Sequence, residues 1–135
     1  MDRIIKGKID EYGFPYLETE IINPENGLQA FNVKTIIDTG SAYTLVKPEL
    51  LNGIKITNSI GTTELLNPIR GENISNIFEI DLKINNFRIP KIKARELKEH
   101  TYPCGILIGI DIIKYCNFEY NSKTNSFTLE LMTNT

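Results

Sequence analysis

The amino-acid sequence predicts an all-β domain, built as a sandwich or a barrel. Short runs rich in Ile, Val, Thr, Phe and Tyr recur along the chain, and clusters of Asn, Gly and Pro separate them. Residues 78–84 alternate strictly between apolar and charged side chains, as in a strand with one buried and one solvated face. The chain has 135 residues, enough for one hydrophobic core, so we expect a single domain over residues 1–135.

The composition argues against several classes of function. A formal net charge of −2 disfavours nucleic acid or an anionic membrane as a partner, because both attract strongly basic surfaces. No apolar run approaches the roughly 20 residues that cross a bilayer, and the N-terminus lacks the apolar stretch of a signal peptide. The two cysteines, Cys104 and Cys116, are too few for a disulfide scaffold and are expected to be reduced. We therefore expect a cytoplasmic protein.

The first half of the chain is predicted to be mostly strands. Residues 4–9 and 16–22 have strand composition, and a turn at Asn23-Pro24-Glu25-Asn26-Gly27 leads into the strand 28–33, which continues into 35–37. Pro presets φ in this turn and Asn-Gly accepts a positive φ, so a hairpin with 16–22 is expected. Short strands at 43–46 and 54–56 should flank a helical turn at 47–51, because Pro48 suits a first helical position.

The second half is predicted to contain three hairpins. Residues 61–77 are polar and contain glycine, which indicates a mobile hairpin with its tip in 67–73. Asn85-Asn86 should turn the strand 78–84 into 87–89, and a strand at 91–95 with a solvated basic outer face follows Pro90. Residues 106–108 form an apolar run that ends in Gly109, and a short helix is expected after it. Strands at 117–120 and 126–131 flank the polar turn 121–125.

The stretch from Thr35 to Ser41 carries the first chemical signal. Its apolar, β-branched run ends in Asp38, Thr39, Gly40 and Ser41, which indicates a buried strand followed by a sharp turn. A carboxylate at such a junction lies between the protein interior and water, where acid–base chemistry is often placed. Asp38 is therefore either a turn residue or a catalytic acid.

Other arrangements of reactive residues fit the sequence less well. Ser41 with His100, the single histidine, could form part of a Ser-His-Asp triad, but Ser41 lacks the context of a nucleophile elbow. His100, Cys104 and Cys116 do not have the spacing of a zinc site. The sequence around Asp38 also lacks a phosphate-binding glycine loop. We expect no metal and no cofactor.

Two segments with Gly-terminated apolar runs carry a resemblance to a known family. Residues 36–46 read IIDTGSAYTLV, and residues 106–113 read ILIGIDII. In this order they resemble the two signature segments of the retropepsin-like aspartic proteases, the family of the retroviral proteases and their single-domain bacterial relatives. Residues 118–131 look like the closing hairpin of the bacterial members, so the resemblance covers about residues 16–131.

This resemblance implies a fold and an activity. The fold would be a closed antiparallel retropepsin-like barrel with one short helix after Gly109. Asp-Thr-Gly occurs once in the chain, so the family mechanism requires a homodimer in which two Asp38 carboxylates share one proton. They would activate a water that attacks a peptide bond of a peptide or protein substrate.

The resemblance also implies roles for the neighbours of Asp38. Thr39 would hydrogen-bond to its symmetry mate, Gly40 would let the turn form and bring its amide near the carboxylates, and Ser41 would tune the pair. Gly109 would pack tightly behind the loop. Substrate would contact Ala42 in the cleft and the tip of a flap, the hairpin end around 67–73. The flap residues in question are Pro68, Ile69, Arg70 and Gly71.

Two alternatives remain at this point. The predicted flap tip offers only Gly71 where retroviral flaps are glycine-rich, which favours a peptide-binding or dimerisation module of the same fold with little catalysis. A monomeric β-domain in which Asp38 is a plain turn residue is the other alternative.

Overall fold

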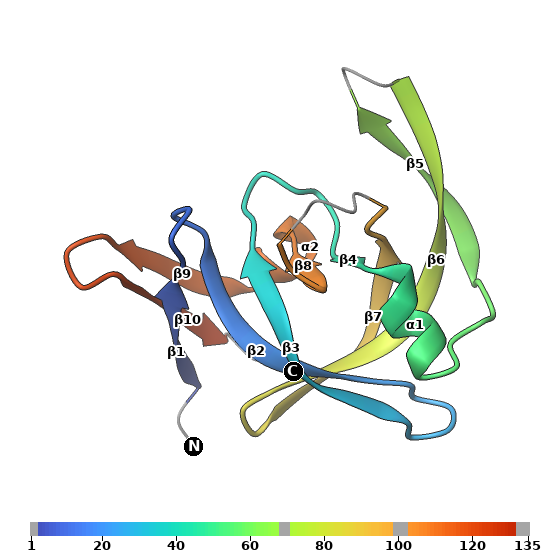
Figure 1. The fold of residues 1–135 in the computed structure, drawn as a ribbon, viewed down its shortest axis with the longest axis horizontal. Helices are drawn as coiled ribbons and strands as arrows, with labels where there is room; N and C mark the ends of the chain where they lie inside the picture. The colour runs from blue at the N-terminus through green and yellow to red at the C-terminus, as the bar shows by residue number, and fades with distance from the viewer. Residues whose placement is uncertain (1–2, 68–70, 99–102, 132–135) are drawn as a thin grey trace.

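The computed structural model describes residues 3–67, 71–98 and 103–131 (Figure 1). The strands are β1 Ile4–Ile9, β2 Pro15–Ile22, β3 Gln29–Ile37, β4 Leu45–Val46, β5 Gly61–Asn67, β6 Gly71–Ile84, β7 Phe87–Glu96, β8 Ile106–Ile108, β9 Cys116–Asn121 and β10 Ser126–Leu131, and the helices are α1 Pro48–Gly53 and α2 Ile110–Ile113. The predicted all-β class is confirmed. None of these helices, in the part of the chain that the structure describes, is long and apolar enough to cross a membrane.

The strands form one sheet that closes into a barrel. Their order is β5-β6-β7-β4-β8-β3-β2-β1-β10-β9, and an additional pairing between β6 and β2 closes the six strands from β6 to β2 into a barrel. β5 extends beyond the barrel at one end of this order, and β1, β10 and β9 extend at the other (Figure 1). Most pairings are antiparallel, as predicted, but β3 pairs with β8 and β4 pairs with β7 in parallel. The short helix expected after Gly109 is α2, and α1 is a second one.

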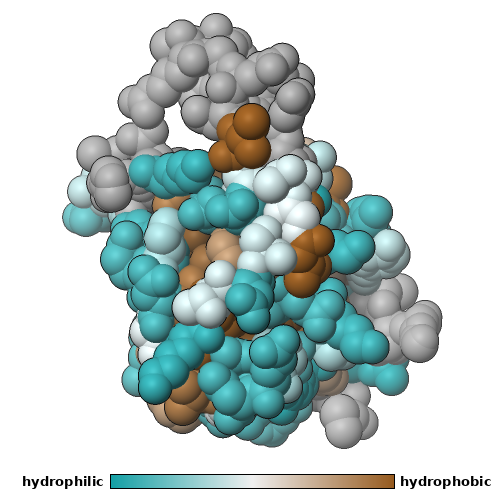
Figure 2. Space-filling view, turned by 90° about the vertical axis from the view of Figure 1, so that its right-hand side faces the viewer, coloured by the Kyte–Doolittle hydropathy of each residue, from teal (hydrophilic) through white to brown (hydrophobic). Residues whose placement is uncertain are grey.

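The core of the barrel comes from the β-branched and leucine residues that define the strands. Ile80 and Leu82 of β6 and Ile106 and Ile108 of β8 have no solvent exposure. β8 is buried at all three positions because it lies between β3 and β4. The face over α1 and the β5–β6 side of the molecule is mostly hydrophilic, with apolar residues in isolated spots (Figure 2).

The hairpin predicted at residues 61–77 is present. β5 pairs with the first half of β6 from Gly61 opposite Ile77 to Asn67 opposite Gly71. This hairpin projects from the barrel at the upper right of Figure 1. Of the predicted flap tip, Gly71 begins β6, and Pro68, Ile69 and Arg70 lie outside the described residues.

Two predicted strands differ from the structure. Residues 54–56 are not a strand, because the chain after α1 turns through Lys55, whose φ is 60°, and the Ile56 amide donates to the carbonyl of Leu51. Only Leu45 and Val46 of the predicted strand 43–46 pair with neighbouring strands.

The strand expected to break at Pro90 is continuous. Pro90 and Lys91 of β7 lie opposite the single residue Asp81 of β6, a bulge that accommodates the proline and the positive φ of Lys91. Asp81 is buried, although the alternation of residues 78–84 predicts that it faces solvent. Its carboxylate accepts hydrogen bonds from the Lys91 amide at 3.0 Å and from Arg88 Nε at 2.9 Å. These bonds offset the cost of burying the charged carboxylate.

Candidate active site

Asp38 follows the buried end of β3. Ile36 and Ile37 are buried, and they pair in parallel with Leu107 and Ile108 of β8. The amide of Asp38 continues this ladder by donating to the carbonyl of Ile108 at 2.9 Å. The ladder ends here, and Asp38 is partly exposed.

The turn after Asp38 holds the carboxylate in one orientation. The Gly40 amide donates to Asp38 Oδ1 at 2.8 Å, and the Ser41 amide donates to the Asp38 carbonyl at 3.2 Å. Thr39 and Gly40 are exposed. The Ser41 hydroxyl donates to the Tyr43 carbonyl at 2.8 Å, so its proton stabilises the loop. Ala42 is exposed in the same loop.

Gly109 lies directly behind this loop. A Cβ at Gly109 would come within 2.4 Å of the Tyr43 carbonyl oxygen and 2.7 Å of the Ser41 carbonyl oxygen. The next residue, Ile110, donates its amide to the Ser41 carbonyl at 2.7 Å. The two Gly-terminated runs of the sequence therefore meet in space, and the absence of a side chain at Gly109 allows the contact.

A second connection joins the loop to α2. Asp111 Oδ2 accepts from the Thr44 amide at 3.0 Å, and Asp111 Oδ1 accepts from the Thr44 hydroxyl at 2.8 Å. Thr44 Oγ1 in turn accepts from the Gly109 amide at 3.3 Å. Both ends of the loop are thus fixed, by β8 at Asp38 and by α2 at Thr44.

Sequence reasoning missed Thr44 and Asp111. Both residues lie within the two quoted segments, but they are 67 positions apart, and no local pattern pairs a hydroxyl with a carboxylate at that separation. The only available signal is an acidic residue in the first turn of a short helix. That placement is usually explained by the helix dipole alone.

The residues weighed as zinc ligands do not form a metal site in the described part of the chain. No group of three His, Cys, Asp or Glu side chains that could hold a metal occurs there, and His100 lies outside it. Cys104 and Cys116 are free thiols, and Cys104 packs with Ile36, Leu97 and Leu107. Burial raises the pKa of both thiols, as expected for inert cysteines.

The architecture is similar to that of known structures. The crystal structure of a retropepsin-like aspartic protease from Rickettsia conorii superposes with a TM-score of 0.67 at 15% sequence identity, over 95% of this chain and 90% of that chain. A Legionella pneumophila protein of unknown function gives a TM-score of only 0.41 at 11% identity, over 72% of this chain and 83% of that chain. No family model matches the sequence, and no curated protein matches it. The chain has the predicted retropepsin-like fold.

Proposed function

We propose that this chain is an aspartic endopeptidase that acts as a homodimer and uses Asp38 from each subunit. We take residues 1–135 as one such domain, with its core at about 16–131. The observation that carries the proposal is the loop around Asp38, which leaves this carboxylate partly exposed and is fixed at both ends, by β8 at Asp38 and by α2 at Thr44. The retropepsin-like fold supports it.

The chemistry follows from pairing two such carboxylates. Two carboxylates in contact cannot both ionise at low cost, so the pair holds one proton. The ionised Asp38 takes a proton from the water between them, and that water attacks the scissile carbonyl carbon. The protonated Asp38 donates to the carbonyl oxygen, and the pair then protonates the leaving amine. The Gly40 amide bonded to Asp38 Oδ1 keeps the carboxylate oriented during these transfers.

The neighbours act on this pair and on the substrate. We propose that Thr39, which is exposed at the turn, forms a hydrogen bond with Thr39 of the second subunit. We also propose that an extended peptide substrate contacts Ala42 and the flap residues Pro68 to Gly71. The free thiols Cys104 and Cys116 support a reducing, cytoplasmic setting.

Asp38→Asn tests the catalytic role. We expect this variant to lose peptide cleavage at acid to neutral pH by at least about 100-fold, because it cannot activate the water. Glu18→Gln, the same chemical change at an exposed residue of β2, is the matched control and should retain full activity. Cleavage of a mixed peptide library by Asp38→Asn at the wild-type rate would refute the proposal.

Mixing the two proteins tests whether the site is shared between subunits. A mixed dimer has only one Asp38 carboxylate, because the variant subunit contributes a neutral amide in its place. Excess Asp38→Asn protein should therefore suppress wild-type activity as subunits exchange. Activity that stays proportional to the wild-type concentration, in a mixture shown to exchange subunits, would mean that one chain suffices.

A peptide-binding module is the second candidate, favoured by the single glycine, Gly71, in the predicted flap tip. A statine-type mimic of the transition state distinguishes the two. An endopeptidase should bind the mimic far more tightly than an intact peptide of the same sequence. A module should bind the intact peptide at least as well.

A further inference from the structure

A cavity away from Asp38 lies between β7 on one side and α2, β9 and β10 on the other. Its volume is about 490 Å³, within the range of sites that enclose small molecules. None of the residues that line it belongs to the loop around Asp38 or to the predicted flap. The peptidase proposed above therefore leaves it unexplained.

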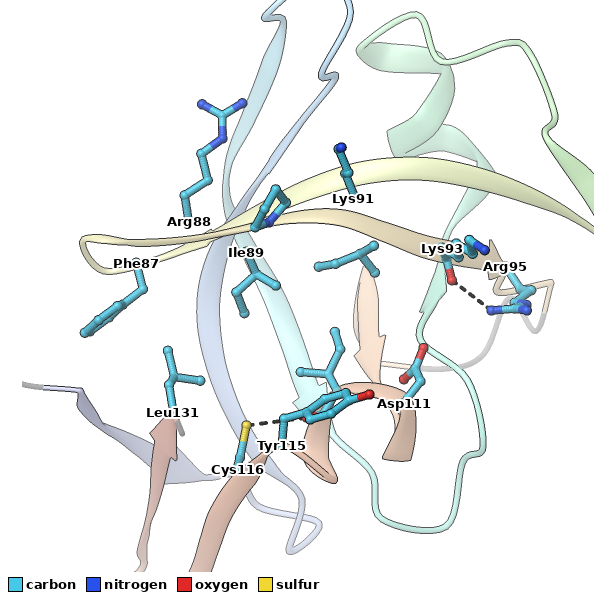
Figure 3. A pocket seen from close by; sticks show the side chains of 13 residues that line it. Phe87, Arg88, Ile89, Lys91, Lys93, Arg95, Asp111, Tyr115, Cys116 and Leu131 are labelled. Carbon is cyan, nitrogen blue, oxygen red and sulfur yellow. Dashed lines mark hydrogen bonds between the residues drawn. The ribbon is translucent and has the colours of Figure 1, made fainter. Parts of the chain in front are cut away.

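One end of the cavity is apolar. Phe87 and Ile89 of β7 point across it toward Leu131 and the Cys116 thiol (Figure 3). Ile112 of α2 also lines the cavity. This end can enclose a hydrocarbon chain, which gains free energy by leaving water.

The other end is polar. Arg95 of β7 lies there with Asp111 of α2, and the hydroxyl of Tyr115 points the same way (Figure 3). Arg95 stacks over the ring of Tyr43 at 4.1 Å, which holds its guanidinium in place.

The charge of the lining is positive. Four of the residues that line the cavity are cationic, namely Arg88, Lys91, Lys93 and Arg95. Asp111 is the one acidic residue of the lining. Arg88 is paired with Asp81, and both Arg88 and Lys91 point away from the cavity (Figure 3). Lys93 and Arg95 lie side by side on β7 at the polar end, where Arg95 Nη1 donates to the Lys93 carbonyl at 2.9 Å (Figure 3). The positive charge of these two residues favours an anionic group there.

We propose that this cavity binds a small amphipathic carboxylate, with its hydrocarbon chain against Phe87, Ile89 and Leu131 and its carboxylate toward Lys93 and Arg95. The apolar end selects the chain and the excess of positive charge selects the sign of the head group. A neutral or cationic molecule of the same length should bind less tightly.

The Cys116 thiol provides a local probe of occupancy. It lines the cavity and is half-buried, and it donates to the Ile112 carbonyl at 3.5 Å. Cys104 lies in a separate apolar cluster and serves as an internal reference. Alkylation by iodoacetamide at alkaline pH, followed by mass spectrometry, reports both thiols in one sample of the full chain.

Octanoate is the probe ligand. At about ten times its dissociation constant it should slow alkylation of Cys116 about tenfold, because only the empty cavity exposes the thiol. The alkylation rate of Cys104 should not change. Octanol and octylamine should protect Cys116 at least several-fold less. Unchanged Cys116 alkylation at saturating octanoate would overturn the proposal, and so would equal protection by octanol.

Two lysine variants test the polar end. Lys93→Gln should weaken octanoate protection several-fold, because it removes a cation near the carboxylate. Lys91→Gln removes the same charge from the same strand, on the side that faces away from the cavity (Figure 3), and should leave protection unchanged. Equal weakening by both variants would show that only the net charge of the protein matters and would overturn the assignment.

Binding of a ligand in the cavity should change the environment of the loop around Asp38. Asp111 and Ile112 line the cavity, and Asp111 also holds Thr44. Octanoate should therefore shift the NMR resonances of the Thr44 and Gly109 amides. Any effect of octanoate on peptidase activity rests on the function proposed above. Thiol protection requires no catalysis, so the cavity proposal and the peptidase proposal can fail separately.

Discussion

Replacing Gly109 by alanine tests how closely α2 and the Asp38 loop pack. Gly109 has φ −102° and ψ −171°, an extended conformation that any residue adopts, so the substitution brings no backbone strain of its own. The added Cβ, however, would lie 2.4 Å from the Tyr43 carbonyl oxygen and 2.7 Å from that of Ser41. Both obstacles are backbone atoms, so no side-chain rotation can relieve the clash.

The size of the effect follows from this geometry. The contact with the Tyr43 oxygen must widen by about 1 Å to reach the 3.4 Å of ordinary van der Waals contact. That movement strains the bonds from Thr44 to Asp111 and from Ile110 to Ser41. We expect the free energy of unfolding to fall by about 2–3 kcal/mol. The melting temperature should fall by about 6–15 °C for a chain of this size.

Urea denaturation followed by circular dichroism measures this change. Gly53→Ala is the matched control, because no atom lies within 4 Å of a Cβ at that position. Since Gly53 ends α1, alanine there should be neutral or stabilise by up to about 1 kcal/mol. The packing argument would be refuted if Gly109→Ala stayed within about 0.5 kcal/mol of the wild type, the range of surface substitutions.

The same substitution should lower the peptidase activity proposed above by more than its effect on stability explains. A reacting group displaced by about 1 Å can lose about 100-fold in rate. We therefore expect folded Gly109→Ala protein, assayed well below its melting temperature, to cleave peptide far more slowly than Gly53→Ala. Equal rates for the two folded variants would show that the Asp38 loop tolerates the displacement.

Two further predictions concern carboxylates that hold loops. Asp111→Asn should cost less stability than Asp111→Ala, because the oxygen of the new amide can still accept from the Thr44 amide. Asp111→Ala should cost about 1–3 kcal/mol by leaving both the amide and the hydroxyl of Thr44 unpaired, and denaturant titration of the two variants separates these outcomes. For Asp10, burial by itself raises the pKa, but hydrogen bonds from the Phe14 amide, Lys34 and the Tyr12 amide outweigh it and hold the pKa below its ordinary value. A lowered folded pKa means that Asp10 stabilises the protein above about pH 4 and that this contribution is lost at lower pH. Asp10→Asn should therefore be less stable than the wild type by about 1 kcal/mol at pH 7 and equally stable near pH 2, and a constant difference across this range would contradict the assignment.

Local patterns in the sequence predicted the position of Asp38 well. A β-branched run is stable as a buried strand, and the following Gly40 permits a tight turn, so the end of β3 could be located from neighbouring residues alone. The turn at Asn85-Asn86 was predictable for the same reason, because Asn85 accepts the φ of 54° that it adopts. Such features depend on residues that are close in sequence.

Features that depend on distant residues were not predictable in this way. Ile54 and Ile56 alternate with Lys55 as in a strand, but they fill the core from a loop, and the Ile54 carbonyl accepts from Asn23. Asp81 looks like a solvated strand residue until the bulge in β7 supplies the Lys91 amide. The contact between Thr44 and Asp111 likewise exists only after two distant segments meet.

The position of β8 has a consequence for synthesis on the ribosome. β8 is the central strand between β3 and β4, yet its residues are translated long after both of them. Until residues 106–113 emerge, Asp38 has no carbonyl from Ile108 to bond and Thr44 has no carboxylate from Asp111. A nascent chain therefore carries the Asp-Thr-Gly sequence before it can form these bonds, and the Asp38 loop acquires its shape only after residues 106–113 have left the ribosome.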